Sequence, residues 1–285
     1  MGFFKKLFGT NSSPEVEETK HDADYEIVRF DGIKAIKAGR FDHAERCFLY
    51  VLEHDDSDLE AHDYLSQTYI HLGKLDEAYA QLRILANAEP DNAQIWMRMA
   101  NVSYMDEKYE QMLSDAQRAL QLTPDDAVCH YLVAMAQNGL GNSEAAIDEL
   151  STAISQHENY GDARLLRAQI YLKENNLDAA ASDAAVLYEH VPESEDVLLL
   201  NARLAHAKGD DAGAFDFYQK TIDVNPFCRD AYKERAALYE ATGNAEKANE
   251  DRQMLSEIDG SENNENIEQK IKERQKDSLV NPFGL

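Results

Sequence analysis

The sequence predicts an all-α protein built as an array of repeated helix pairs, and three regular spacings support this prediction. Glycines recur at intervals of 34 residues or multiples of 34, at Gly39, Gly73, Gly141, Gly209 and Gly243. Five residues later each unit carries Ala44, Ala78, Met112, Ala146, Ala180, Ala214 or Ala248. Within the array, prolines occur only 17 residues after the glycine position, at Pro90, Pro124, Pro192 and Pro226. A fixed period of this length indicates repeats that bury their apolar faces against one another.

Seven units of 34 residues fit the chain without a gap from Tyr25 to Glu262. Position 8 of every unit is small: Gly32, Ser66, Ala100, Ala134, Ala168, Ala202 and Ala236. Small residues at positions 8 and 20 allow two antiparallel helices to approach closely. Glycine or asparagine at position 15 can adopt the left-handed conformation that ends the first helix. Glu107 adopts this conformation at a higher cost than Asn175, so we expect a differently built turn in the third repeat.

The ends of the second helices are also marked in the sequence. Proline cannot continue a helix, and it moves the preceding residue out of helical geometry. Just beyond the proline position, Asn92, Asp126 and Ser194 are placed to cap the first helix of the next repeat. Each repeat is therefore expected to contain two helices joined by a tight turn.

The combination of small residue, turn glycine, packing alanine and terminal proline resembles the tetratricopeptide repeat family across residues 25–262. The third repeat matches it best, with Trp96, Ala100, Tyr109, Ala119 and Pro124. The resemblance implies a right-handed α-solenoid of seven helix-turn-helix repeats, in which the first helices line the inside. It also implies a non-catalytic role in binding protein segments.

Three regions are expected along the chain. Residues 1–24 comprise a short apolar and basic segment, MGFFKKLFG, followed by a polar stretch that reads as a flexible linker. Residues 25–262 form the seven-repeat solenoid. Residues 263–285 contain a helix with a narrow apolar edge at Ile267 and Ile271, suited to capping the last repeat, and an apolar tail.

The first helices carry an apolar stripe with polar neighbours, which suits an extended peptide or a partner helix. The positions that the family directs inward define a candidate peptide-binding groove. Its members are Met97, Arg98, Asn101, Tyr104, Tyr131, Met135, Leu165, Gln169, Lys173, Leu199 and Arg203. The apolar members are expected to anchor the partner and the polar ones to hold its backbone or a carboxylate. A stripe at helical spacing is also typical of a core, and this alternative stays open.

Composition restricts the partners. The net charge is −26, from 54 acidic and 28 basic residues. This charge disfavours nucleic acid, which requires basic surface, and broad contact with anionic lipid. A protein or peptide partner, basic or apolar in character, is favoured, and membrane contact is restricted to residues 3–8. The cysteines, Cys47, Cys129 and Cys228, share no repeat position, which indicates free thiols in a reducing compartment. We expect a cytoplasmic protein, with peripheral membrane attachment as the alternative.

The sequence shows no motif for catalysis, cofactor binding or metal binding. It contains no Gly-rich phosphate loop, nucleophile elbow or HExxH motif. His54, Asp58 and His62 are spaced by four residues but cross a predicted turn, so they do not share the common face that a metal site needs. We expect no enzyme, no cofactor and no metal site.

Two classes of function remain. The first is an adaptor, scaffold or assembly factor that binds a segment of another protein in the groove. The second is a structural protein that self-associates through its apolar termini, or a scaffold recruited to a membrane. The repeat pattern does not define an oligomeric state.

Overall fold

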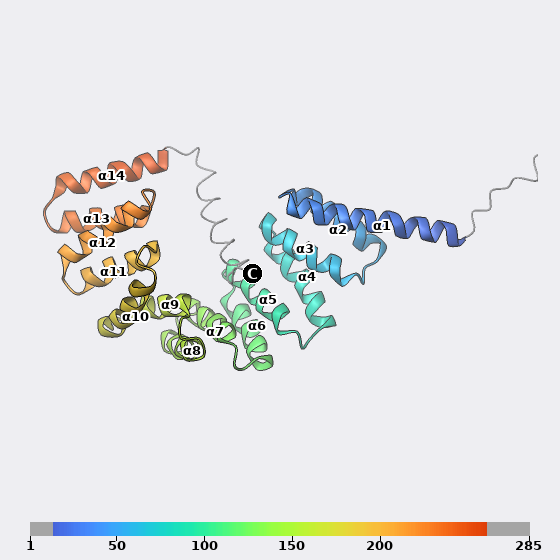
Figure 1. Ribbon diagram of the computed structural model, residues 1–285, viewed down its shortest axis with the longest axis horizontal. Coiled ribbons are helices and arrows are strands. Elements are labelled where there is room, and N and C mark those ends of the chain that lie inside the picture. The colour runs from blue at the N-terminus through green and yellow to red at the C-terminus, as the bar shows by residue number, and fades with distance from the viewer. Residues whose placement is uncertain (1–13, 261–285) are drawn as a thin grey trace, which may run out of the picture. The chain divides into compact units, whose positions relative to one another are not determined.

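The computed structural model describes residues 14–260, with side chains described from Tyr25 onward, and these residues form fourteen α-helices and no β-strand (Figure 1). They divide between Leu122 and Thr123 into two compact units. No described helix combines the length and apolar character that crossing a membrane requires. The predicted all-α architecture, with two helices in each repeat, is confirmed.

The first unit contains three helix pairs. Their bounds are α1 Pro14–Lys37, α2 Phe41–His54, α3 Leu59–Leu72, α4 Leu75–Ala88, α5 Ala93–Met105 and α6 Tyr109–Leu122. Each helix packs against the helix before it and the helix after it within the unit. One apolar core, which includes Phe48, Leu65 and Leu82, runs through α1 to α5.

The second unit contains four helix pairs. Their bounds are α7 Ala127–Gly139, α8 Ser143–Gln156, α9 Gly161–Lys173, α10 Leu177–His190, α11 Glu195–Ala207, α12 Asp211–Val224, α13 Arg229–Ala241 and α14 Ala245–Gly260. Consecutive helices again pack against each other, and α9 also contacts α11. The first helices of repeats 5 and 6 are therefore neighbours.

The small residues lie where the paired helices approach closely. The residues at position 8 and position 20 are buried in every repeat. At Gly32 the requirement is strict, because an added Cβ would lie 2.9 Å from Cζ of Phe48 and 3.0 Å from Cβ of Cys47. The sequence period thus records the contact between the two helices of each repeat.

The turn between the helices is the same in all seven repeats, so the prediction of a different turn at Glu107 was wrong. Glu107 has a φ of 55° and Asn175 a φ of 58°, as positive as the glycines at the same position. The amide of Glu107 donates to the carbonyl of Tyr104 at 3.0 Å, and that of Lys108 donates to Ser103 at 2.9 Å. These two backbone hydrogen bonds hold a conformation that costs a side-chain-bearing residue about 1–2 kcal/mol.

Two of the three predicted helix caps are present. Asn92 accepts a hydrogen bond from the amide of Gln94, and Asp126 accepts one from the amide of Val128. Ser194 lies at the N-cap of α11, but its side chain makes no capping hydrogen bond, so this prediction was wrong. Asp58 caps α3 by accepting a hydrogen bond from the amide of Ala61, which was not among the predicted caps.

The first helix begins before the start predicted for the first repeat. Helix α1 begins at Pro14, whereas a linker was expected up to residue 24. Proline suits this place because the first turn of a helix needs no amide donor there. The apolar segment at residues 3–8, and the capping helix and apolar tail expected within residues 263–285, lie outside the described residues. The self-association and membrane hypotheses depend on these segments and stay predictions.

Candidate functional site

In the first unit, the predicted groove residues are largely engaged within the protein. Met97 is 6% exposed and belongs to the core. Arg98 donates to Oγ of Ser66 at 2.8 Å and pairs with Asp63 of the preceding repeat. Asn101 and Tyr104 are half-buried. Arg98 is therefore committed to a contact between two repeats and offers little free charge for a partner's carboxylate.

In the second unit, the predicted residues divide into core and surface. Met135 is 7% exposed and Leu199 is 6% exposed, so neither presents an accessible anchor. Tyr131 and Leu165 are half-buried and pack against apolar cores. The remaining predicted residues are polar: Gln169 and Lys173 are exposed, and Arg203 is half-buried.

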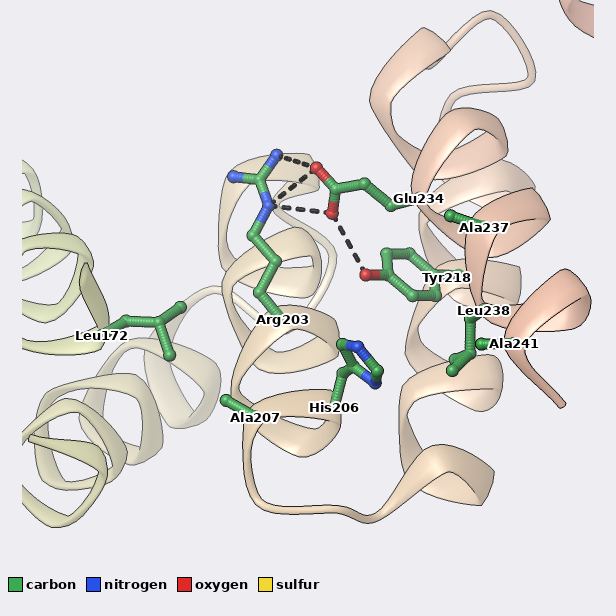
Figure 2. A pocket seen from close by; sticks show the side chains of 9 residues that line it. All are labelled: Leu172, Arg203, His206, Ala207, Tyr218, Glu234, Ala237, Leu238 and Ala241. Atoms are coloured by element: carbon green, nitrogen blue, oxygen red, sulfur yellow. Dashed lines mark hydrogen bonds and ion pairs between the residues drawn. The ribbon is translucent and has the colours of Figure 1, made fainter. Parts of the chain in front are cut away.

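Arg203 lies in an open pocket of about 550 Å³ in the second unit (Figure 2). Four helices supply its walls: α9, α11, α12 and α13. The lining residues are Leu172, Arg203, His206, Ala207, Tyr218, Glu234, Ala237, Leu238 and Ala241. Most of the walls are apolar and many of the side chains are small, because α11 and α13 carry alanines where they border the pocket. Only Arg203 of the predicted groove set lies here.

A hydrogen-bonded network forms the polar side of this pocket, as Figure 2 shows. Nη2 of Arg203 lies 2.7 Å from Oε1 of Glu234, and Nε lies 3.0 Å from Oε2. The hydroxyl of Tyr218 donates to Oε2 of Glu234 at 3.1 Å. The hydrogen bond to Glu234 raises the pKa of Arg203, and burial, together with Glu234, raises the pKa of Tyr218. The network thus consists of the charged pair Arg203–Glu234 and the neutral hydroxyl of Tyr218, which holds Glu234 in place.

The rim of the pocket is acidic overall. Nη2 of Arg203 also lies 3.1 Å from Oδ2 of Asp230, and Nδ1 of His206 lies 3.0 Å from Oδ1 of Asp211. Arg203 is therefore matched by two carboxylates. A cationic group of a ligand would meet a more favourable potential here than an anionic one.

A second set of buried polar residues is structural. Arg167 holds Asp183 through two hydrogen bonds of 2.8 Å, and Arg235 holds Asp251 through bonds of 2.9 and 2.6 Å. Both pairs join position 7 to position 23 of the same repeat. Each pair joins the first helix of its repeat to the second. Because these charges are buried, each needs a partner of opposite charge.

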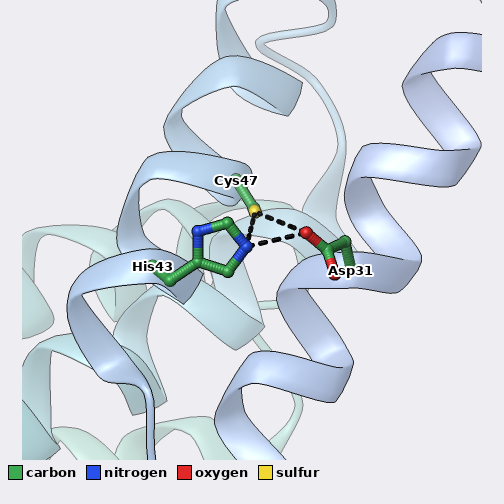
Figure 3. Close-up of side chains that lie close together, drawn as sticks. All are labelled: Asp31, His43 and Cys47. Atoms are coloured by element: carbon green, nitrogen blue, oxygen red, sulfur yellow. Dashed lines mark hydrogen bonds and ion pairs between the residues drawn. The ribbon is translucent and has the colours of Figure 1, made fainter.

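Three side chains of the first repeat also meet, although no sequence motif pointed to them. Oδ2 of Asp31 on α1 lies 2.7 Å from Nε2 of His43 on α2, and Sγ of Cys47 lies 3.7 Å from the same nitrogen (Figure 3). Burial and the Asp31 carboxylate raise the pKa of Cys47, while the hydrogen bond from His43 lowers the pKa of Asp31. A raised thiol pKa does not suit a nucleophilic cysteine.

Two segments of the chain match family models. Residues 35–102 and residues 134–190 each match a model described as tetratricopeptide repeat. Over these two segments the chain belongs to the tetratricopeptide repeat family. The fold agrees: a tetratricopeptide repeat protein from Parabacteroides merdae superposes with a TM-score of 0.72 at 18% identity, over 90% of this chain and 99% of that one.

One further structure and one curated protein are similar over part of the chain. YrrB, whose structure is described as having an unusual peptide-binding site, gives a TM-score of 0.51 at 20% identity, over 66% of this chain and 97% of YrrB. The BBSome complex member BBS4 of Xenopus tropicalis is 30% identical over 149 residues, which is 51% of this chain and 28% of BBS4. The match therefore spans less than a third of that relative. Tetratricopeptide repeats are interaction folds, so a role in protein–protein interaction follows from the family.

Proposed function

We propose that this tetratricopeptide repeat protein is a non-catalytic adaptor or assembly factor that holds a segment of a partner protein on the second unit, at the pocket between α9, α11, α12 and α13. The observation that carries the proposal is the pocket itself. It combines accessible apolar walls with one fixed polar network, the usual composition of a ligand site. The described structural neighbour with a peptide-binding site supports this kind of use for the fold.

The shape of the pocket favours an apolar anchor. Leu172 and Leu238 face it together with three alanines, so an aliphatic or aromatic side chain of a partner can enter without displacing a large residue. A volume of about 550 Å³ lies within the range of roughly 300–1,000 Å³ that is typical of ligand pockets.

The charges favour a basic neighbour to that anchor. Arg203 is matched by Glu234 and Asp230, so the rim keeps an excess of carboxylate. The net charge of −26 acts in the same direction over longer distances. The proposed ligand is therefore an apolar residue flanked by lysine or arginine. Gln169 and Lys173 are exposed on α9, the helix that also supplies Leu172 to the pocket, and in this proposal they would contact the backbone of such a segment.

A peptide library displayed on phage and selected against the intact chain tests this proposal. We expect enrichment of sequences with a large apolar residue next to Lys or Arg. Ala237→Trp would fill the pocket from an exposed position, and it should weaken the selected peptides at least about 10-fold.

Ala212→Trp provides the matched control, because Ala212 is exposed on α12 and is not part of the pocket lining. It should leave the affinity unchanged. Equal binding of the selected peptides by wild type and Ala237→Trp would contradict the proposal.

A further inference from the structure

The side chains of Asp31, His43 and Cys47 converge on one point at the surface of the first repeat (Figure 3). His43 and Cys47 lie one turn apart on α2, which places them on the same helix face. Asp31 reaches them from α1. One oxygen, one nitrogen and one sulfur all lie within 4.8 Å of one another.

The atoms that meet distinguish between two kinds of chemistry. In a cysteine–histidine–aspartate triad, the carboxylate contacts one ring nitrogen and the thiol contacts the other. Here Asp31 and Cys47 both face Nε2 of His43. A proton relay through the ring is therefore not formed, whereas three donor atoms that face a common centre suit the binding of an ion.

Comparison between repeats strengthens this interpretation. Asp31 and Cys47 occupy positions 7 and 23, the two positions that hold an arginine and an aspartate in repeats 5 and 7. In those repeats the pair is neutral because opposite charges meet, as in Arg167 with Asp183. In the first repeat both positions carry groups that become anionic, so a cation between them would neutralise their charge as the arginine does in repeats 5 and 7.

We propose that Asp31, His43 and Cys47 form a three-ligand site for a zinc ion. Thiolate, imidazole and carboxylate are the ligands that zinc takes, whereas magnesium and calcium take oxygen. Three protein ligands leave a fourth position. That position faces solvent here, because the side chains of Asp31 and His43 are 50% and 35% exposed.

Two of the three distances between donor atoms are close to those of a zinc site, and the third is shorter. Bonds of about 2.0–2.3 Å at a tetrahedral centre place neighbouring donor atoms roughly 3.3–3.6 Å apart. Sγ of Cys47 lies 3.7 Å from Nε2 of His43 and 4.0 Å from Oδ2 of Asp31. The oxygen–nitrogen distance of 2.7 Å is that of a hydrogen bond and has to lengthen on metal binding, which the exposed Asp31 side chain permits. Arg40 and Arg46 act on the cluster and oppose a cation, so affinity should require both anionic ligands.

Titration of the chelator-treated full chain with Co²⁺ tests the proposal, since cobalt replaces zinc and reports its ligands. We expect a thiolate-to-cobalt charge-transfer absorption at one equivalent, reversed by Zn²⁺. Cys47→Ala should abolish the band. Asp31→Asn should weaken Zn²⁺ binding at least about 10-fold, measured by calorimetry.

Cys129→Ala is the matched control. Cys129 is also buried, but its thiol lies 3.2 Å from Oγ1 of Thr123 and belongs to no group of three metal-binding side chains among residues 25–260. This variant should keep the band. Asp31→Asn changes an exposed side chain, so it tests the site even if Cys47→Ala fails to fold. Absence of a charge-transfer band in wild type, or its persistence in Cys47→Ala, would overturn the proposal and leave an ordinary hydrogen bond between Asp31 and His43.

Discussion

The hydroxyl of Tyr79 in the second repeat donates a 2.9 Å hydrogen bond to the buried carboxylate of Asp115 in the third. Asp115 occupies position 23, as Asp183 does in the fifth repeat, yet the two aspartates differ in their partners. Asp183 is paired with Arg167 and Arg164. No cation acts on Asp115 among the described residues, and burial raises its pKa to about 6.

Asp115→Asn should therefore stabilise the protein at neutral pH. The folded-state pKa of about 6 lies above the ordinary 3.8, so the folded state binds the proton more tightly. The cost of the buried charge is fully present above pH 6 and is relieved as the pH falls toward 3.8. Asparagine keeps a polar partner for Tyr79 and removes that cost, so we expect a gain of about 1–2 kcal/mol at pH 7.5 that shrinks toward pH 4.5, measured by urea unfolding.

Asp183→Asn is the matched control for that substitution, at the same repeat position. It would leave a buried arginine without its counter-charge, and it should lower the free energy of unfolding by about 3 kcal/mol. If both variants lose stability to a similar extent, the carboxylate of Asp115 makes a favourable contact that outweighs its burial.

Glu107→Gly should stabilise the third repeat. The residue already has a φ of 55°, and glycine adopts that conformation without steric cost. We expect the free energy of unfolding to rise by about 1 kcal/mol. Asn175→Gly should gain less, because asparagine tolerates the left-handed region better. Gly141→Ala should lose about 1 kcal/mol, since its φ is 81°. A loss of stability in Glu107→Gly would show that its side chain has a role beyond the turn.

Gly32→Ala should destabilise the first repeat by about 1–3 kcal/mol, because the new methyl group would press on Phe48 and Cys47 in the tightest contact between α1 and α2. Gly161→Ala is the control: the nearest atom to its added Cβ is a leucine methyl 4.0 Å away, and the site lies at the start of α9. Thermal unfolding should show a decrease for the first variant and no decrease for the second. Equal melting temperatures would mean that α1 shifts at little cost.

Glu234→Gln should alter the charge preference of the pocket in the second unit. Glutamine retains a contact with the Tyr218 hydroxyl, but it no longer neutralises Arg203. Peptides with a basic flank should bind about 5–10-fold more weakly, and peptides with an acidic flank more tightly. Calorimetry at low and physiological salt measures both, and a parallel loss for the two kinds of peptide would instead indicate damage to the pocket wall.

The fold was predictable because the repeat period directly encodes a contact. Gly73 and Ala78 recur in register, so the turn and the close helix packing could be read without knowing any long-range neighbour. The prediction for the turn at Glu107 was wrong because the preference of glycine and asparagine for the left-handed conformation was taken as a requirement. Hydrogen bonds from two backbone amides stabilise the left-handed conformation, which glutamate itself does not favour.

The candidate site was only partly predictable. Met97 and Leu199 share a helix face with true surface residues, and helical spacing alone cannot show that the folded protein buries them. Arg98 was expected to be available, but its partner Asp63 lies 35 residues away in the preceding repeat. The Asp31–His43–Cys47 cluster escaped because its members lie on two helices. Comparing positions 7 and 23 across repeats would have related Asp31 to Cys47, and His43 lies one helical turn before Cys47.

The charged pairs Arg98–Asp63 and Arg203–Glu234 each bridge the first helices of two consecutive repeats. In an array of this kind, cooperativity of unfolding depends on the strength of the interface between adjacent repeats. Exposed and half-buried ion pairs weaken as ionic strength rises. Salt concentration therefore controls how far local unfolding that starts in one repeat spreads to the next. In concentrated salt each unit should unfold repeat by repeat. In dilute buffer each unit should unfold more nearly as a whole.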